Sequence, residues 1–355
     1  MEFTTVTTDE PHRIRRKELL ARHPEIRKLY GYDLRPALIT VGAVALQLAI
    51  AAGLQVLANS GVGSGTILLC QLGLAFGVGA VLSHWAGVVI HEASHNLCAP
   101  TPRLNRWLAL FANFHVPLPA AMSFFRYHLD HHAFMGIEGR DNDLPTQFER
   151  SAFSSGPVRK FAWLVLYPFF AAFARGFWRR PSRWEVFGAV LQLTVDVVIL
   201  TTFGSTAFSY LLWSMLFGYG IHPVAGHFIH EHYLWSDGQE TYSYYGPLNY
   251  LTWNIGYHNE HHDFMQVPGA RLPELHRIAR EVYGQLESHR SWTKVYWLFV
   301  RTQKLGHHSR FVRAKTGRTA KQSRLGQEML TGSQPSAGDG VRVKRTSGDD
   351  ACVSA

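Results

Sequence analysis

Two long stretches in the first quarter of the chain carry no charged side chain. Pro36–Ala58 and Gly65–Ile90 contain no Asp, Glu, Lys or Arg. As a helix that rises 1.5 Å per residue, the first stretch would be roughly 34 Å long, which is enough to cross a hydrocarbon core of about 30 Å. Buried helices of soluble proteins are rarely this long and uncharged. The chain is therefore predicted to be an integral membrane protein.

Two further apolar stretches follow in the second half of the chain. Val186–Phe203 and Thr206–Ile221 are predicted to be a second pair of membrane crossings, joined at Gly204-Ser205. Asp196 lies inside the first of them, where an acid is either functional or a polar contact between helices. Asn105–Ala121 is also apolar, but two prolines interrupt it, so we expect a re-entrant or interfacial segment. The predicted fold is all-α, a polytopic membrane protein with about four transmembrane helices and a cytosolic helical cap.

The charged residues gather outside these apolar stretches. Lys and Arg exceed Asp and Glu by nine, and the excess flanks the apolar spans, which suits an anionic membrane surface better than a nucleic-acid groove. The short loops 59–64 and 204–205 contain no Lys or Arg. Because basic residues favour the cytosolic side, both chain ends are predicted to be cytosolic. Three cysteines without a C-x-x-C spacing exclude a disulfide scaffold.

These features divide the chain into three parts. Residues 1–35 form a polar, basic and cytosolic segment without the apolar core of a signal peptide. Residues 36–310 form the membrane domain, in which residues 161–177 are expected to be an aromatic interfacial helix followed by snorkelling arginines. Residues 311–355 are basic and poor in aromatic residues, so we expect a disordered tail.

The twenty histidines are concentrated in a few clusters. Three clusters follow apolar segments and have the forms H-x-x-x-H, H-x-x-H-H and H-x-x-H-H. On a helix, positions i, i+3 and i+4 share one face, so each cluster points two or three imidazoles the same way. The predicted topology puts all three clusters on the cytosolic side, where they can converge. Their members are His91, His95, His128, His131, His132, His258, His261 and His262.

Eight imidazoles exceed the four ligands of one zinc ion, so the clusters predict a site for two metal ions. Imidazole binds zinc, copper, iron and nickel, so the ligand type does not identify the metal. His227 and His232 are candidates to complete the coordination. Four other histidines are expected to be structural contacts or to face solvent: His84, His115, His222 and His230. Acids that could hold the outer ring nitrogens of the ligands are Asp130, Glu260 and Asp263, together with Asp141 and Asp143.

The first histidine cluster allows a different interpretation. His91–His95 matches H-E-x-x-H, in which Glu92 would be the general base of a zinc protease. An intramembrane zinc protease needs only one further ligand, and it leaves the other two clusters without a role. A non-catalytic lipid or metal carrier is a third class, and no feature of the sequence favours it.

The order of the three clusters between apolar stretches resembles the membrane fatty-acid desaturase and hydroxylase superfamily. More narrowly, the chain resembles the sphingolipid delta-4 desaturases, also called dihydroceramide desaturases. The resemblance covers roughly residues 8–310. Its most specific parts are TDEPH at 8–12, GHFI at 226–229, ETYSYYGPLN at 240–249 and GYHNEHHDF at 256–264.

The resemblance implies a di-iron centre, molecular oxygen as co-substrate, and electrons from NADH through cytochrome b5 and its reductase. It implies insertion of a trans double bond between carbons 4 and 5 of the long-chain base of dihydroceramide, in the endoplasmic reticulum membrane. It carries the role of metal ligand to the eight clustered histidines and to His227 and His232. The chain has no haem motif of a fused cytochrome b5 and no dinucleotide-binding motif, so we expect a separate electron donor.

Some features depart from that family or leave its activity open. Animal members carry a myristoylated glycine after the initiator methionine, whereas this chain has Glu2. The ending Cys352-Val-Ser-Ala resembles a prenylation box only weakly. Some members also hydroxylate carbon 4, so a C4-hydroxylase, or a bifunctional enzyme, is the alternative. We expect Phe124, Phe125 and Tyr127 to control this outcome, although packing at the membrane interface would also explain them.

Overall fold

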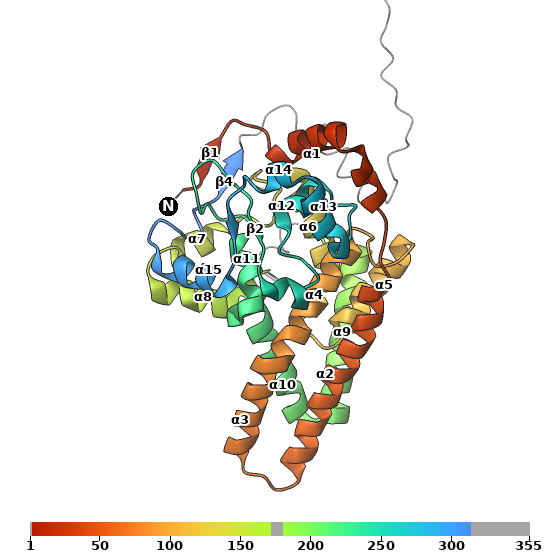
Figure 1. Cartoon of the computed structure of the whole chain (residues 1–355). Coiled ribbons are helices and arrows are strands. Elements are labelled where there is room, and N and C mark those ends of the chain that lie inside the picture. The colour runs from red at the N-terminus through yellow and green to blue at the C-terminus, as the bar shows by residue number, and fades with distance from the viewer. Residues whose placement is uncertain (1, 172–179, 314–355) are drawn as a thin grey trace, which may run out of the picture.

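The computed structural model describes residues 2–171 and 180–313. It consists of a stem of long helices and a cap of shorter elements at one end of the stem (Figure 1). The mainly helical fold predicted from the sequence is confirmed. Residues 314–355 of the predicted tail and residues 172–177 of the predicted interfacial helix lie outside the described residues. The first three residues of the predicted disordered tail, 311–313, instead form a β-strand, and residues 161–169 are helical as predicted.

Three helices of the stem are long and apolar enough to cross a membrane. They are α2 (Arg35–Asn59), the continuous helix Ser64–Ser94, and α9 (Arg183–Phe203). The continuous helix consists of α3 (Ser64–Leu74), a π-helical turn at Ala75–Gly79 and α4 (Ala80–Ser94). Three of the four predicted crossings are therefore present as helices of sufficient length, and their ends lie within a few residues of the prediction.

The fourth predicted crossing is a shorter helix. In the stem, α10 (Ser205–Leu216) continues into a π-helical turn at Phe217–Ile221 and packs against α2 and α4. About 17 residues of helix would reach roughly 25 Å, so a count of four spans remains a prediction. On the neighbouring α9, Asp196 accepts a hydrogen bond from Gln192 Nε2 at 2.9 Å. Gln192 in turn accepts one from Asn113 on another helix, which agrees with a polar contact.

Glycine allows α4 and the π-helical turn after α10 to approach each other closely. A Cβ atom at Gly218 would lie 2.4 Å from the carbonyl oxygen of Ala80, so a larger residue would force the two backbones apart. This contact holds the first residue of α4 against the segment that follows α10. Because His91 lies near the end of α4, the same contact helps to place the first histidine cluster in the cap.

The other helices are short, and most of them build the cap. They are α1 (Pro11–Arg22), α5 (Pro102–Asn113), α6 (Ala121–Phe134), α7 (Gln147–Phe153), α8 (Pro157–Phe169), α11 (His227–His230), α12 (His258–Asp263), α13 (Leu272–Ile278), α14 (Arg280–Tyr283) and α15 (Trp292–Arg301). Two parallel strand pairs, which the sequence did not predict, join distant segments. The pairs are β1 (Thr4–Val6) with β4 (Phe311–Arg313), and β2 (Ser243–Tyr244) with β3 (Ser288–His289).

The proline-containing segment between α5 and α6 is a loop. Pro117 and Pro119 both lie in it, which explains why the apolar stretch does not form one helix. Asn113 closes the loop, because its Nδ2 donates to the carbonyl of Leu118 at 2.8 Å and its Oδ1 accepts from the amide of Ala121 at 3.0 Å. The loop fixes the start of α6, which carries the second histidine cluster. Its predicted re-entrant or interfacial position remains a prediction.

Candidate metal centre and lipid pocket

Three helices bring the predicted histidine clusters to one place in the cap. The first cluster lies at the end of α4, the second on α6 and the third on α12. The ring centroids of His91 and His128 are 4.3 Å apart, and those of His132 and His262 are 4.2 Å apart. Clusters that are far apart in the sequence therefore meet, and their nitrogens fall into two groups.

The first group joins all three clusters through Nε2 atoms. His95 Nε2 lies 2.9 Å from His128 Nε2, which lies 3.0 Å from His132 Nε2. His261 Nε2 continues the series at 3.2 Å from His132 Nε2 and 3.0 Å from His91 Nε2. Five imidazoles thus present the same ring atom to one small volume. We call them the first nitrogen group.

The second group adds a histidine from outside the three clusters. His131 Nε2 lies 3.0 Å from His232 Nε2, and His258 Nε2 lies 2.9 Å from the same atom. His262 offers a ring nitrogen within 4.8 Å of those of His131 and His232, and its Nε2 is buried without a hydrogen-bond partner. These four residues form the second nitrogen group.

The spacing in the first group fits metal ligands better than hydrogen bonds. One ring nitrogen of a neutral imidazole carries either a hydrogen or a lone pair, so each can take part in one N–H···N bond. Of the four short contacts between the five Nε2 atoms, at most two can then be hydrogen bonds at the same time. Two ligands about 2.1 Å from a shared ion, at bond angles near 90°, lie about 3.0 Å apart. The observed distances match that separation.

The electrostatics of the buried rings agree with metal binding. Burial lowers the pKa of His128, His132 and His261 well below the usual value for histidine, so these rings are neutral and keep a lone pair for an ion. In His131, burial is the largest single effect and acts to lower the pKa, but the charge and hydrogen bond of Asp141, together with the charge of Asp143, outweigh it and the pKa is raised. Asp141 Oδ1 lies 2.8 Å from His131 Nδ1, which holds the proton there and leaves Nε2 for the metal side.

Acids contact outer nitrogens in the second nitrogen group. Asp141 does so at His131, and Glu231 Oε1 lies 3.3 Å from Nδ1 of His258. Burial raises the pKa of Glu231 well above the usual value for a carboxyl group. The sequence included Asp141 among the candidate acids but did not single out Glu231 for this role.

Of the three acids that the sequence favoured for the outer contacts, two contact other residues. Asp130 is buried on α6, and its role as an acceptor stays a prediction. Glu260 accepts hydrogen bonds from Ser243, Tyr245 and His276. Asp263 contacts His12, Arg15 and Tyr283, which are distant in sequence and carry no local signal for this contact. The candidate Asp143 forms an ion pair with Arg310 at 2.6 Å.

The remaining histidines occupy structural positions or line a pocket. His84 Nδ1 lies 2.9 Å from the carbonyl of Gly218, and His115 Nε2 lies 3.1 Å from that of Leu82, so both are the expected hydrogen-bonded helix contacts. His230 is fully buried against Trp292. His222 caps a 3₁₀ turn through the amide of Val224. His227 belongs to neither nitrogen group and instead lines the pocket described next.

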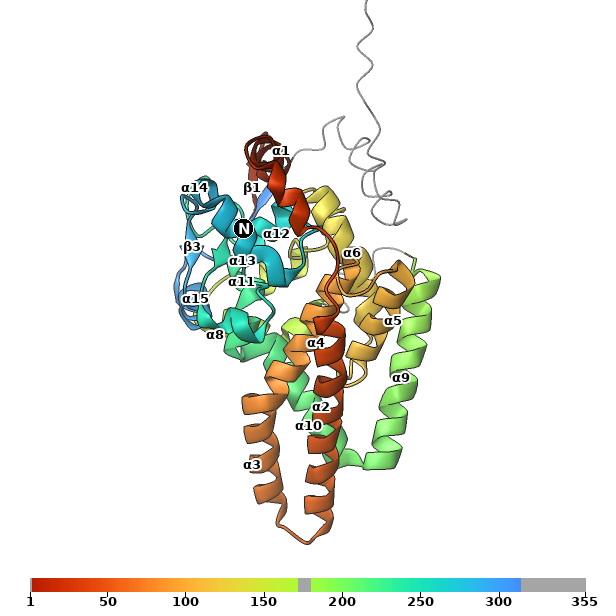
Figure 2. The ribbon, with the colours of Figure 1, turned by 45° about the vertical axis from the view of Figure 1, so that its right-hand side comes forward.

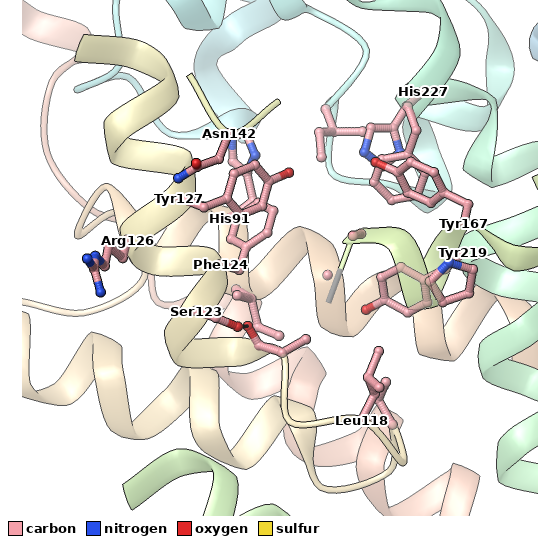
Figure 3. A pocket seen from close by; sticks show the side chains of 18 of the residues that line it. His91, Leu118, Ser123, Phe124, Arg126, Tyr127, Asn142, Tyr167, Tyr219 and His227 are labelled. Carbon is pink, nitrogen blue, oxygen red and sulfur yellow. Dashed lines mark hydrogen bonds between the residues drawn. The ribbon is translucent and has the colours of Figure 1, made fainter. Parts of the chain in front are cut away.

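An apolar pocket runs from the stem helices to the first nitrogen group (Figure 3). It encloses about 1060 Å³, including its open mouth. Figure 3 shows two walls, one with Tyr127, His91, Phe124 and Ser123, and the other with His227, Tyr167 and Tyr219. The ring of Phe124 stacks on His128, with centroids 5.0 Å apart and planes at 14°. The pocket therefore offers an apolar chain direct access to the histidines.

Glu92 does not occupy the position of a protease base. Its Oε2 accepts a hydrogen bond from the amide of Gly269 at 2.9 Å, and the side chain is buried. His91 and His95 belong to a group of five histidines whose Nε2 atoms lie in series, instead of a three-ligand zinc site. The geometry therefore gives the zinc protease alternative no support.

The fold and the histidines define a class: helical membrane proteins with a histidine-rich centre at the end of an apolar pocket. A family model described as fatty acid desaturase matches residues 65–294, and a model described as sphingolipid Delta4-desaturase (DES) matches residues 1–35. The chain is 42% identical over 314 residues to the Oryza sativa subsp. japonica protein named sphingolipid delta(4)-desaturase DES1-like, which covers 88% of this chain and 93% of that protein.

Two animal proteins are similarly related. Sphingolipid delta(4)-desaturase/C4-monooxygenase DES2 of Rattus norvegicus is 43% identical over 88% of this chain and 95% of its own length. Sphingolipid delta(4)-desaturase DES1 of Drosophila melanogaster is 40% identical over 89% of this chain and 97% of its own length. The chain belongs to the sphingolipid delta(4)-desaturases of the fatty acid desaturase family. It is therefore an oxidoreductase of a membrane-bound, generally iron-dependent family that acts on lipids.

Proposed function

We propose that this protein inserts a trans double bond between carbons 4 and 5 of the long-chain base of dihydroceramide and so produces ceramide. The observation that carries the proposal is the meeting of two groups of imidazole nitrogens at the end of an apolar pocket. The names of the relatives support both the sphingolipid substrate and the position of the double bond.

We propose that each nitrogen group holds one iron ion. The first ion would be bound by His91, His95, His128, His132 and His261, and the second by His131, His232, His258 and His262. Bound iron would supply, with molecular oxygen, an oxidant for the C–H bonds of an unactivated methylene, which acid–base residues cannot break. The unoccupied Nε2 of His262 and the 3 Å spacing of its neighbours support this assignment.

The proposed reaction is a four-electron reduction of oxygen. Dihydroceramide gives up two hydrogens, and NADH with one proton supplies the rest, so that the products are ceramide, NAD⁺ and two water molecules. We propose that electrons pass from NADH through cytochrome b5 reductase and cytochrome b5. The chain's own task is to bind the lipid and exclude water, which the aromatic walls at Phe124, Tyr167 and Tyr219 are placed to do.

The position of the double bond requires polar groups beside the histidines. In dihydroceramide the amide nitrogen and the 3-hydroxyl are attached to carbons 2 and 3, so they lie within about 4 Å of carbon 4. Asn142, Tyr127 and His227 are among the polar side chains that line the pocket with His91. The buried side chain of His227 lines the pocket beside these groups. We propose that His227 binds the polar end of the substrate.

Replacing His227 with Phe should leave the metal content unchanged and reduce turnover of dihydroceramide. The preference of the wild-type protein for dihydroceramide over its 3-deoxy analogue should shrink by about tenfold, because one hydrogen bond to the polar end is lost. Turnover of both lipids and bound iron are measured on the same preparation. Loss of an iron ion would instead make His227 a ligand, as the sequence predicted.

The test of the proposed function is a product analysis. Membranes that contain the protein are supplied with a short-chain dihydroceramide, NADH and oxygen, and the lipids are identified by mass spectrometry. We expect mainly the 4,5-alkene. Membranes from cells that lack the protein are the control, and no oxidised product above that control would refute the function.

Hydroxylation at carbon 4 is the second candidate, because the Rattus norvegicus relative is named both desaturase and C4-monooxygenase. Phytoceramide as the main product would establish it. Phe124 and Phe125 both pack against an apolar core cluster, but only Phe124 and Tyr127 line the pocket. We therefore propose that Phe124 and Tyr127 set the balance between the products, since small shifts of the chain near the metal change relative rates.

The charge distribution supports a topology for this membrane protein. We propose that it resides in the endoplasmic reticulum membrane with both termini and the cap in the cytosol, and with loop 59–64 in the lumen. A tag inserted at residue 60 should be inaccessible in sealed microsomes, whereas a C-terminal tag should be accessible to protease. A glycosylation acceptor in the tail should remain unmodified, and its modification would overturn the topology.

A further inference from the structure

The N-terminal segment packs against the helix that carries the third histidine cluster. Figures 1 and 2 both show α1 at the end of the cap away from the stem, beside α12, and the two helices are in contact. No residue of the segment belongs to either nitrogen group. Because the segment contributes no proposed ligand, its effect on the metal centre has to pass through α12.

Asp263, the last residue of α12, is the centre of this contact. Its carboxylate is completely buried and accepts hydrogen bonds from Arg15 Nε at 2.5 Å and Arg15 Nη2 at 2.9 Å. His12 Nδ1 lies 2.7 Å from the same carboxylate, and Tyr283 Oη donates to it at 3.0 Å. The bidentate geometry of an arginine fixes the orientation of a carboxylate as well as its position. Two residues of α1 therefore hold the last residue of α12 in place.

His12 also contacts the nitrogen groups directly. Its ring centroid lies 4.7 Å from that of His262. Both rings line a cavity that also includes His132 and the side chains of Arg13 and Arg16. A shift of α1 would thus change the packing of His262. This residue immediately precedes Asp263 in the sequence.

The N-terminal segment also contacts parts of the chain that are distant in sequence, both before His12 and after Arg15. β1 pairs with β4, and Arg313 Nε at the end of β4 donates to the carbonyl of Thr8 at 3.1 Å. Leu19 and Ile26 are fully buried in an apolar cluster with Phe264, the residue after Asp263. Residues 4–29 therefore form a closed strap over α12, fastened on both sides of His12 and Arg15.

We propose that residues 4–29 act as a positioning strap for the metal centre, in which His12 and Arg15 set α12 and so align His258, His261 and His262. Docking of the strap and metal binding are then coupled. Coupling is reciprocal, so that whatever weakens the strap weakens metal binding, and removal of the metal loosens the strap. The inference rests on the proposed function only in that the nitrogen groups hold metal.

The first experiment compares two variants of α1 that lose the same charge. Arg15→Gln removes the contact with Asp263, whereas Lys17→Gln removes an exposed charge on the same helix. Iron bound to the purified full-length proteins is titrated with bipyridyl. We expect the Arg15→Gln protein to release iron at a bipyridyl concentration about tenfold lower than the wild type does. A loss of metal affinity of this size is typical when a residue that orients metal ligands is replaced. Lys17→Gln should behave as the wild type, and His12→Phe should resemble Arg15→Gln.

The second experiment needs no substitution. Hydrogen–deuterium exchange of the wild-type protein is measured with iron bound and after chelation. After iron removal, we expect hydrogen exchange to become faster in β1, α1 and α12, while α2 remains protected. Equal exchange in α1 in the two states, or Arg15→Gln protein that holds iron as tightly as the wild type, would overturn the strap. A wild-type protein without metal would refute the proposed function instead.

Discussion

Replacing His131 or His261 with Ala should reduce desaturation below detection, with a loss of at least one iron ion per chain. His131 Nε2 lies 3.0 Å from its neighbour in the second nitrogen group, and His261 Nε2 lies within 3.2 Å of two members of the first. A removed ligand has no substitute, because the ring nitrogens of the other imidazoles already face the proposed ions. The measurements are iron per chain and the yield of the 4,5-alkene.

Membrane insertion should not change in these variants, because neither residue lies in a stem helix. His308→Ala is the matched control, since His308 lies outside both nitrogen groups and should keep iron and activity. One bound zinc ion with peptidase activity in the wild-type protein would contradict the desaturase proposal. Full activity of His131→Ala and His261→Ala would show that the nitrogen groups are not the metal site.

Of the substitutions proposed for this protein, Asp263→Ala should cause the largest loss of stability. We expect the free energy of unfolding to fall by about 3–5 kcal/mol. The substitution leaves the largely buried side chain of Arg15 and the buried ring of His12 without their shared partner. Removing one member of a buried charge pair is costly because the other remains desolvated. We expect the thermal unfolding midpoint in detergent to fall by roughly 5–10 °C.

Asp263→Asn is the control for shape, since it keeps the size of the side chain and part of its hydrogen bonding but loses the charge. Its midpoint should lie between those of the wild type and Asp263→Ala. A midpoint of Asp263→Ala within about 1 °C of the wild type would mean that the contacts of Arg15 and His12 add little to stability.

Local physical chemistry determined much of this protein from the sequence. Long apolar stretches with at most one charged residue have few places to fold outside a membrane, so three long stem helices could be predicted with nearly the observed ends. The helical period placed the imidazoles of each cluster on one face. The distribution of Lys and Arg then predicted that the three clusters lie on the same, cytosolic side of the membrane. In the structure the three clusters converge.

Tertiary structure alone decided how the histidines are divided. His131 and His132 are adjacent in sequence, yet they belong to different nitrogen groups. His232 lies in the second group, whereas His227, five residues earlier, lines the pocket. Neither distinction is encoded in spacing, because each depends on which helix from elsewhere in the chain faces the residue.

The strap was also beyond the reach of sequence reasoning. Asp263 was expected to hold a ligand, but it binds Arg15, a residue 248 positions away. A sequence pattern reports contacts between residues a few positions apart, since those follow from the geometry of one helix or strand. Contacts such as Arg15–Asp263 and His91–His261 arise only when the packed helices fix the path of the whole chain. The sequence therefore determined which residues could bind metal, and the packing of distant segments decided which of them meet.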